Sequence, residues 1–548
     1  MVLFGLSSME TLLLSFNELN GTLDDIPDPL SSFLYFIDLR SNSLNGHISK
    51  SFFDMTRLEV LWLGSNQFKG IVELSLLWKL RALDSLDLSN NMVSVIDVED
   101  GYPIPYLHKI TDLLLASCNL TKIPVALTYV SEMSNLDLSN NRIDGAIPSW
   151  IWVNWKDTIS FLNLSNNMFT SLENSPSVIH VNSLQFLDLS SNKLHGSVPI
   201  PLTANTWVLL DYSKNSFSSI IPDFGCMLQT IDINSNRIEG KIPRSLSNCR
   251  SLEILDIGSN GIHDCFPYWL GKMSNLRILI LRSNQFYGSI QGPTEFDANS
   301  KHFSGLQIID LASNNFSGSL NSKWFDRLET MMTNSSGEGN ALVIGKNIPG
   351  DNYYHESLTF KGIDLTFTKI LSTFKMIDFS NNAFDGPIPE SIGKLIALHG
   401  LNVSHNCFTG GIPSKLGELA QLESLDLSRN KFSGLIPQEL ATLTYLAVLN
   451  LSYNDLTGMI PQGPQFSLFA SSSFKGNEEL CGKPLSKQCN SSGTGNLNSS
   501  VSSKDSVGTI LLFAFVGSGF GVGFAVALVL SVVWQAKRWN CSCFLFHR

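Results

Sequence analysis

The sequence lacks the residue patterns that most enzymes use for chemistry. It has no His-Glu-x-x-His pair, no paired Cys-x-x-Cys, no glycine-rich phosphate loop and no Gly-x-Ser-x-Gly turn, and its 10 histidines are scattered. Catalytic groups must converge on one site and metal ligands need short, regular spacings. We therefore expect a protein that is not an enzyme, with no catalytic residue, no metal site and no cofactor.

Positive charge is also scarce. The chain has 37 Lys and Arg against 48 Asp and Glu, for a net charge of −11. Residues 507–548 contain three basic residues and no acid, so the rest of the chain is more acidic still. Because a surface of this sign repels phosphates, we exclude nucleic acid as a partner.

The sequence does contain one strongly repeated pattern. Four segments, IDFSNNAFDGPIP, LNVSHNCFTGGIP, LDLSRNKFSGLIP and LNLSYNDLTGMIP, follow one another with asparagines 24 residues apart at Asn382, Asn406, Asn430 and Asn454. A fixed period of this length, with Leu-x-Leu before an Asn, is typical of a leucine-rich-repeat solenoid. One coil cannot bury its own apolar edge, so the copies are stable only as a stack.

Each position of the repeat has a physical role. Leu425 and Leu427 alternate with polar residues, which predicts a short strand on the concave face with its leucines buried. Asn430 can satisfy buried backbone groups of neighbouring coils, so stacked copies predict an asparagine ladder. Phe432 is expected to fill the interior and Gly434 to permit the bend.

Equivalent ladder positions continue toward the N-terminus at Asn17, Asn42, Asn66, Asn91, Cys118, Asn141, Asn167, Asn192, Asn215, Asn236, Asn260, Asn284 and Asn314. With the later four they predict 17 coils. At the spacing of neighbouring strands, the parallel concave sheet would be on the order of 80 Å long, which suits an extended peptide or a protein partner. The first residues have no basic start typical of a secretory signal and run directly into a coil, so we expect an N-terminally truncated chain.

One insertion interrupts the repeats. Between Asn314 and Asn382 lie 68 residues where 24 would serve. The segment SLTFKGIDLTF alternates apolar and polar residues as strands do, and Tyr353 and Tyr354 lie nearby. We predict a folded island, whereas the alternative is a disordered or spacing loop.

A different composition follows the last coil. Cys481 and Cys489 are spaced for a small disulfide-closed cap. Residues 507–534 form an uncharged run that is long enough to cross a bilayer as a helix. Lys537 and Arg538 follow this run directly. The positive-inside rule therefore predicts a single-pass plasma-membrane protein with its solenoid outside and its C-terminus in the cytosol.

The predicted span contains glycines with helix-pairing spacing. Gly517, Gly519, Gly521 and Gly523 form two overlapping Gly-x-x-x-Gly pairs, which favour contact with a partner helix, although glycine is common in membrane helices. The tail after it, residues 535–548, is too short for a folded domain. Its Cys541 and Cys543 are either palmitoylated or free thiols.

The remaining cysteines and the sequons agree with an extracellular solenoid. Cys226 and Cys249 occupy nearly equivalent places on adjacent coils and are a candidate disulfide. Cys118, Cys265 and Cys407 are expected to be buried thiols. Candidate N-glycosylation sites are Asn20, Asn119, Asn163, Asn315, Asn334, Asn402, Asn450, Asn490 and Asn498.

These features together resemble the plant leucine-rich-repeat receptor-like proteins. The resemblance rests on the repeat form, on LLLASCNLTKIP, on the island followed by four coils, on the GNEELCG cap and on the glycine-rich helix with its stub tail, and it is closest to the disease-resistance members. It implies that Gly517 to Gly523 hold an adaptor leucine-rich-repeat receptor kinase. It also implies that the island with Tyr353 and Tyr354 binds ligand, and that the coils at Asn382 to Asn454 face a co-receptor kinase. The chain departs from the family by lacking a signal peptide, an N-terminal cap and an acidic run before the membrane.

The expected organisation is leucine-rich repeats at 1–322, the island at 323–373, four repeats at 374–461, the cysteine cap at 462–489, a polar stalk at 490–506, the transmembrane helix at 507–534 and the tail at 535–548. The expected function is a cell-surface glycoprotein receptor for an extracellular peptide, protein or pathogen-derived ligand, which signals in plant defence by recruiting kinases. The alternatives are a developmental peptide receptor, a truncated inactive relative or a wall-associated enzyme inhibitor. The predicted membrane span argues against the last of these.

Overall fold

The computed structural model describes residues 8–23, 25–26, 29–77, 79–97, 109–204, 208–224, 228–290, 302–333, 356–367 and 370–489. Residues 1–489 form one compact unit, and the second unit, 490–548, lies outside the described residues together with the predicted span and tail. Within the described ranges, no helix combines the length and the apolar character needed to cross a bilayer.

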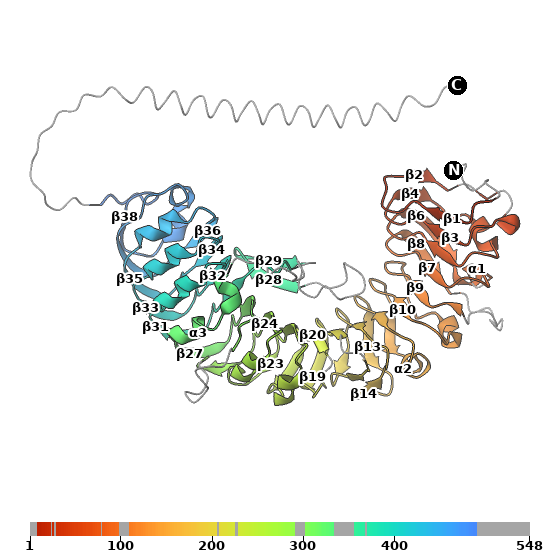
Figure 1. The fold of residues 1–548 in the computed structure, drawn as a ribbon, viewed down its shortest axis with the longest axis horizontal. Helices are drawn as coiled ribbons and strands as arrows, with labels where there is room; N and C mark the ends of the chain where they lie inside the picture. Colours follow the sequence, from red (N-terminus) through yellow and green to blue (C-terminus); the bar gives the residue numbers. More distant parts are fainter. Residues whose placement is uncertain are drawn as a thin grey trace, which may run out of the picture. The chain divides into compact units, whose positions relative to one another are not determined.

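A parallel sheet of 17 short strands forms the concave face, which confirms the number of predicted coils (Figure 1). The strands pair in chain order and in direct register. They are β1 (Thr11–Leu13), β3 (Phe36–Asp38), β5 (Val60–Trp62), β7 (Ser85–Asp87), β9 (Asp112–Leu114), β10 (Asn135–Asp137), β12 (Phe161–Asn163), β15 (Phe186–Asp188), β18 (Val208–Asp211), β20 (Leu228–Asp232), β22 (Ile254–Asp256), β24 (Ile278–Ile280), β26 (Ile308–Asp310), β30 (Met376–Asp378), β32 (Gly400–Asn402), β34 (Ser424–Asp426) and β36 (Val448–Asn450).

The asparagine ladder holds neighbouring coils together as predicted. Asn430 donates from Nδ2 to the carbonyl oxygen of Val403 in the preceding coil at 3.0 Å, and the backbone N–H of Phe432 donates to Oδ1 of Asn454 in the next coil at 3.0 Å. Asn17, in the first described coil, donates only within its own turn. The sequence reasoning missed one more ladder residue, Asn477 in the cap, which accepts from the N–H of Leu456 at 3.0 Å.

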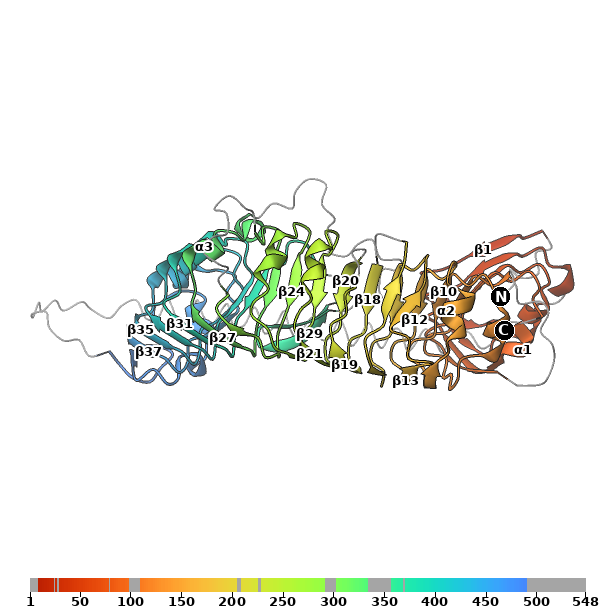
Figure 2. The ribbon, with the colours of Figure 1, turned by 90° about the horizontal axis from the view of Figure 1, so that it is seen from below.

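Short strands line one flank of the stack, and short helices occur between the coils (Figure 2). The flanking strands are β2 (Asn20–Thr22), β4 (Ser43–Gly46), β6 (Gln67–Glu73), β8 (Met92–Ile96), β11 (Asp144–Ile147), β13 (Met168–Leu172), β16 (His195–Gly196), β19 (Ser216–Ile220), β21 (Arg237–Gly240), β23 (Gly261–Ile262), β25 (Tyr287–Gly288), β27 (Asn315–Ser319), β31 (Ala383–Gly386), β33 (Cys407–Gly410), β35 (Lys431–Leu435), β37 (Asp455–Met459) and β38 (Glu479–Cys481). Two further strands, β14 (Val178–His180) and β17 (Ile200–Leu202), follow β13 and β16 in their coils and pair with each other in a separate parallel sheet. Among the described residues, the α-helices are α1 (Leu74–Leu77), α2 (Trp150–Asn154) and α3 (Ser322–Phe325). 3-10 turns such as Glu390–Lys394, Ser414–Glu418 and Gln438–Thr442 follow the Ile-Pro of later coils.

The core lies between the concave sheet and the flank. A column of stacked phenylalanines passes through it, with ring centroids 5.9 to 6.1 Å apart from Phe286 through Phe316, Phe384 and Phe408 to Phe432. Gly434 adopts a φ of 77°, which supports its predicted role at the bend, because residues with a Cβ rarely take that conformation.

The concave sheet and the phenylalanine column continue without interruption across the insertion. Strand β26 pairs directly with β30, and Phe316 stacks on Phe384 across the inserted segment at 6.0 Å. Within the insertion, β28 (Glu356–Phe360) and β29 (Ile363–Phe367) form an antiparallel hairpin, which confirms the predicted strands. Figure 1 shows this hairpin on the inner side of the stack of coils.

Candidate functional site: the concave face and its hairpin

The concave face presents two rows of side chains. In each strand the last residue and the residue two positions before it face this side, whereas the residue between them is buried. The last residues include an aspartate row, made of Asp38, Asp87, Asp137, Asp188, Asp211, Asp232, Asp256, Asp310, Asp378 and Asp426. Asp188, Asp211, Asp232 and Asp256 lie on four successive strands in direct register. Carboxylates therefore adjoin one another along this part of the sheet.

Asp188 and Asp211, two buried carboxylates of this row, hold protons more tightly than free ones. Asp188 accepts the N–H of Ser190 at 2.8 Å, and Asp211 accepts the N–H of Ser213 at 2.9 Å. Burial, together with the charge of Asp211, raises the pKa of Asp188 well above its ordinary value. Burial also raises the pKa of Asp211 to about 6, although the hydrogen bonds from Ser213 act in the opposite direction.

A groove of about 570 Å³ follows the aspartate row over the coils from β1 to β18. Its lining is mostly polar and includes Arg40, Asp87, Asp137, Asp188, Asp211 and Lys214. Thr366 of the hairpin strand β29 also contributes to the lining. The groove is thus an elongated polar channel, lined by four aspartates and two cations among neutral residues, and the hairpin borders it.

The other row becomes apolar where the hairpin covers it. We call Ile254, Ile278, Ile308 and Met376, on β22, β24, β26 and β30, the apolar row. Together with Ile280 and with Leu358 and Phe360 of the hairpin, these residues form one buried cluster that is separate from the solenoid core. The three isoleucines of the row are fully buried. Burial of this apolar area is the main stabilisation of the hairpin on the sheet.

Phe360 inserts where the sheet has no side chain. A Cβ added to Gly400 would lie 2.9 Å from Cε2 of Phe360, which is closer than atoms in proteins approach without rearrangement. Phe360 also packs edge-on against Phe374, with ring centroids 5.0 Å apart. Gly400 therefore leaves room for the hairpin on β32.

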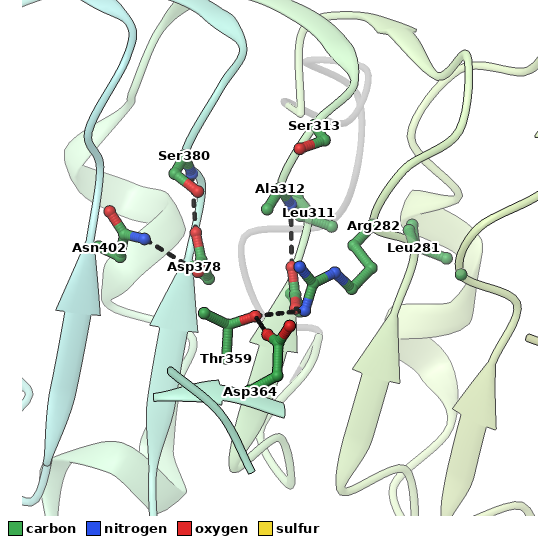
Figure 3. Close-up of polar contacts among 12 residues, drawn as sticks. Leu281, Arg282, Leu311, Ala312, Ser313, Thr359, Asp364, Asp378, Ser380 and Asn402 are labelled. Carbon is green, nitrogen blue, oxygen red and sulfur yellow. Dashed lines mark hydrogen bonds and ion pairs between the residues drawn. The ribbon is translucent and has the colours of Figure 1, made fainter. Parts of the chain in front are cut away.

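Polar contacts fix the hairpin over the sheet (Figure 3). Arg282 donates from Nη1 to Oγ1 of Thr359 at 2.6 Å and lies 3.5 Å from Oδ2 of Asp310. Thr359 in turn donates to Oδ1 of Asp364 on the opposite strand of the hairpin at 2.5 Å. At the turn of the hairpin, Lys361 forms an ion pair with Glu423 at 2.7 Å. One cation from the sheet and one from the hairpin thus hold the two parts together.

Two aspartates lie side by side at the base of this contact. Asp310 and Asp378 are register partners on β26 and β30, with 0% and 2% of their surface exposed. Burial and the charge of Asp378 raise the pKa of Asp310 to about 8, against the opposing effect of Arg282. Burial also raises the pKa of Asp378, which accepts from Nδ2 of Asn402 at 3.0 Å.

Several predicted site residues lie outside the described residues, namely Tyr353, Tyr354, Gly517, Gly519, Gly521, Gly523, Cys226, Asn334, Asn490 and Asn498. The predicted pairing of Cys226 with the buried Cys249 stays a prediction for the same reason. Cys481 and Cys489 form a disulfide with their Cα atoms 5.1 Å apart. This bond closes the cap next to β38.

The three cysteines expected to be buried thiols differ from one another. Cys118 is buried in its ladder position, where burial raises the pKa of its thiol to about 12. The expectation is wrong for Cys265, which is exposed because it lies on the flank beside Tyr287 rather than in the core. Cys407 is only half-buried, at the start of the flanking strand β33.

The described sequons fall into two groups. Asn20, Asn119 and Asn315 are exposed and lie off the concave sheet. Asn163 is 4% exposed on β12. The amides of Asn402 and Asn450, also on the concave face, donate to Asp378 at 3.0 Å and to Asp426 at 3.2 Å. A glycan on Asn402 or Asn450 would therefore have to share the side-chain amide with this hydrogen bond to an aspartate.

The sequence did not lead us to predict the residues of the sheet on which the hairpin packs. Ile254, Ile278 and Ile308 occupy strand positions that are polar in β7, β9 and β10, in successive coils just before the insertion. Apolar residues at positions that a bare solenoid exposes to water favour a covering segment, but Phe161, Phe186 and Leu209 occupy the same position on β12, β15 and β18, so this pattern does not single out the strands under the hairpin. Arg282 and Gly400 carried no comparable signal.

Comparisons with known proteins agree with the repeat architecture. Family models of the leucine-rich repeat match residues 227–286 and residues 133–154, 183–204, 373–395 and 421–443. Receptor-like protein 18 of Arabidopsis thaliana is 36% identical over 410 residues, which cover 72% of this chain and 48% of the relative. Receptor-like protein 54 of the same species is 35% identical and covers 72% of this chain and 55% of the relative. The chain thus spans about half the length of these curated relatives.

Two solved structures are similar over most of the chain. The complex PEPR1-AtPEP1 matches with a TM-score of 0.65 and 27% identity, covering 87% of this chain and 63% of that one. The Arabidopsis receptor kinase HAESA, solved with the peptide hormone IDA and the co-receptor SERK1, matches with a TM-score of 0.51 and 25% identity, covering 88% of each chain.

Proposed function

This chain is a leucine-rich-repeat protein homologous to plant receptor-like proteins, and on that premise we propose that it is a cell-surface receptor for an extracellular peptide or protein. The observation that carries the proposal is the groove of about 570 Å³ on a concave sheet whose fold matches PEPR1-AtPEP1. Its elongated form suits an extended segment, whose backbone and side chains could meet successive coils.

We propose that signalling proceeds through kinases that the receptor recruits, in plant defence. HAESA, the receptor kinase with a similar fold, was solved in complex with both a peptide hormone and a co-receptor. By analogy, the island with Tyr353 and Tyr354 would contribute to the ligand site, and the coils from Asn382 to Asn454 would face a co-receptor. A helix at 507–534 would bind an adaptor leucine-rich-repeat receptor kinase through Gly517, Gly519, Gly521 and Gly523.

The test is a pull-down of the full chain, expressed with a supplied signal peptide and solubilised in detergent, against candidate leucine-rich-repeat receptor kinases. We expect a retained kinase and a glycosidase-sensitive mobility shift. A matched pair of variants sharpens the result: leucine at all four glycines should weaken retention, whereas Ala527→Leu in the same segment should not. A glycosylated protein that retains no kinase would overturn the kinase-recruitment proposal.

A developmental peptide receptor is the second candidate, favoured by the similarity to HAESA with its peptide hormone. The two roles share an architecture and differ in ligand. Binding of an endogenous plant peptide but of no microbial product to the solubilised chain would select the developmental role.

A further inference from the structure

The contact between hairpin and sheet contains an imbalance of charge. Asp310 and Asp378 adjoin each other beneath the hairpin, and both are buried. Arg282 is the cation that faces them, and it lies 3.5 Å from Asp310 while also donating to Thr359 of the hairpin at 2.6 Å. When both carboxylates are ionised, one positive charge faces two negative charges under an apolar cover.

The other titratable groups around this pair do not remove the imbalance. Asp256 on β22 and Asp364 on the hairpin are further acids facing the same space. Asn402, on the strand beyond Asp378, is neutral. At the opposite end of the hairpin, Lys361 is engaged by Glu423, and the half-buried His399 packs on Phe374 near the same Glu423.

We propose that the hairpin β28–β29 is a proton-linked cover of the concave face. It stays closed while the Asp310–Asp378 pair retains a proton, and release of that proton favours opening and exposes the apolar row. The apolar row that opening uncovers begins at Ile254 on β22. Strand β20 connects β22 along the sheet to β18, in the last of the coils that line the groove.

The direction of the effect follows from linkage. Closure adds the cover of the hairpin above Asp310, whose pKa in the closed form is raised to about 8, so the closed form binds the proton more tightly than the open form. The extra stability of the closed form is therefore fully present below the pKa of Asp310 in the open form and is lost as pH rises toward 8. If one proton is released on opening, the closed-to-open ratio falls by up to about tenfold per pH unit in that interval.

Hydrogen exchange of the full chain in detergent tests this directly. Protection factors of amides in Glu356–Phe367, corrected for intrinsic exchange, should fall at least about tenfold between pH 5 and pH 8. Asp310→Asn should abolish the fall and keep the hairpin protected at both values. Asp87→Asn, in the same row on β7 and remote from the hairpin, should leave the fall unchanged.

Two more variants separate the proposal from its rivals. Thr359→Val removes the hairpin side of the Arg282 contact, so it should lower protection at both pH values while keeping their ratio. His399→Gln should retain the fall, and a fall lost with His399 would assign the response to that imidazole instead. If Asp310→Asn does not fold, Asp378→Asn carries the same expectation. Protection that changes less than about twofold in the unmodified chain overturns the proposal.

Discussion

Two stretches of the concave face share one frame and differ in chemistry. In β7, β9 and β10 the residues two positions before the strand end are Ser85, Asp112 and Asn135, whereas in β22, β24 and β26 they are isoleucines. The buried middle residues are alike in both stretches, and the ladder position is Asn in all six coils except that of β9, where it is Cys118. The frame therefore tolerates either chemistry at this position, and apolar residues also occupy it on β12, β15 and β18, where Phe161, Phe186 and Leu209 form a separate buried cluster.

The largest difference in stability between the two stretches should come from a charge placed under the hairpin, in β22, β24 or β26. Ile308→Asp places a carboxylate in a fully buried position under the hairpin, and an uncompensated buried charge costs about 3 to 5 kcal/mol. Val448→Asp makes the same change at the same strand position on β36, where the side chain is half-exposed, and should cost less than about 1 kcal/mol. Thermal unfolding of both variants measures the difference, and equal losses would contradict the assignment of a cover.

Substitutions of the ladder asparagines should destabilise the two stretches equally. Asn284 bonds the carbonyl of Ile257 at 2.9 Å under the covered stretch, and Asn91 bonds that of Leu63 at 3.0 Å under the open one. Replacing either by Ala leaves buried backbone groups unsatisfied, at about 1 to 3 kcal/mol for each group. Equal falls in the unfolding midpoint are expected, and a much smaller fall for Asn284→Ala would mean that the hairpin compensates for the frame.

A smaller and more local effect is expected at the space that Phe360 occupies. Gly400→Leu should displace the hairpin at a cost of about 1 to 3 kcal/mol and increase protease cleavage between Glu356 and Phe367. Gly411 is the matched control, since an added Cβ there would meet no atom closer than 3.9 Å. Gly411→Ala should leave the cleavage pattern unchanged.

The smallest effect on stability is expected from the sequons. Asn119→Gln and Asn315→Gln should each remove one glycan and shift the mobility of the chain without a change in unfolding midpoint, because both side chains are exposed. Asn402→Gln and Asn163→Gln should produce no mobility shift. Intact-mass measurement decides, and glycan occupancy at Asn402 would contradict the expectation drawn from its bond to Asp378.

Much of this fold could be predicted because the information is local and repeated. Most coils carry an apolar-x-apolar strand, a ladder Asn and a turn Gly, so the roles assigned in the coil of Asn430 predict those in the others. The hairpin strands were predicted for the same reason, since their alternation lies within SLTFKGIDLTF.

The docking of that hairpin could not be predicted in the same way. It depends on contacts between distant residues, such as that of Arg282 with Thr359, which are 77 positions apart. No periodicity relates these partners, and Gly400 resembles any other variable residue until Phe360 is placed over it. The isoleucines at Ile254, Ile278 and Ile308 indicated a cover without identifying which segment provides it.

The phenylalanine column has a consequence for how such a protein can evolve. Phe316 stacks on Phe384 as closely as neighbours elsewhere in the column do, although an entire inserted segment separates them in the chain. The insertion is thus a side branch that leaves and rejoins the solenoid at one coil junction. Mutation and recombination can lengthen, replace or delete such a branch while the coils on either side keep their contacts. Selection can then change the inserted segment of a lineage rapidly while the scaffold that carries it stays nearly constant.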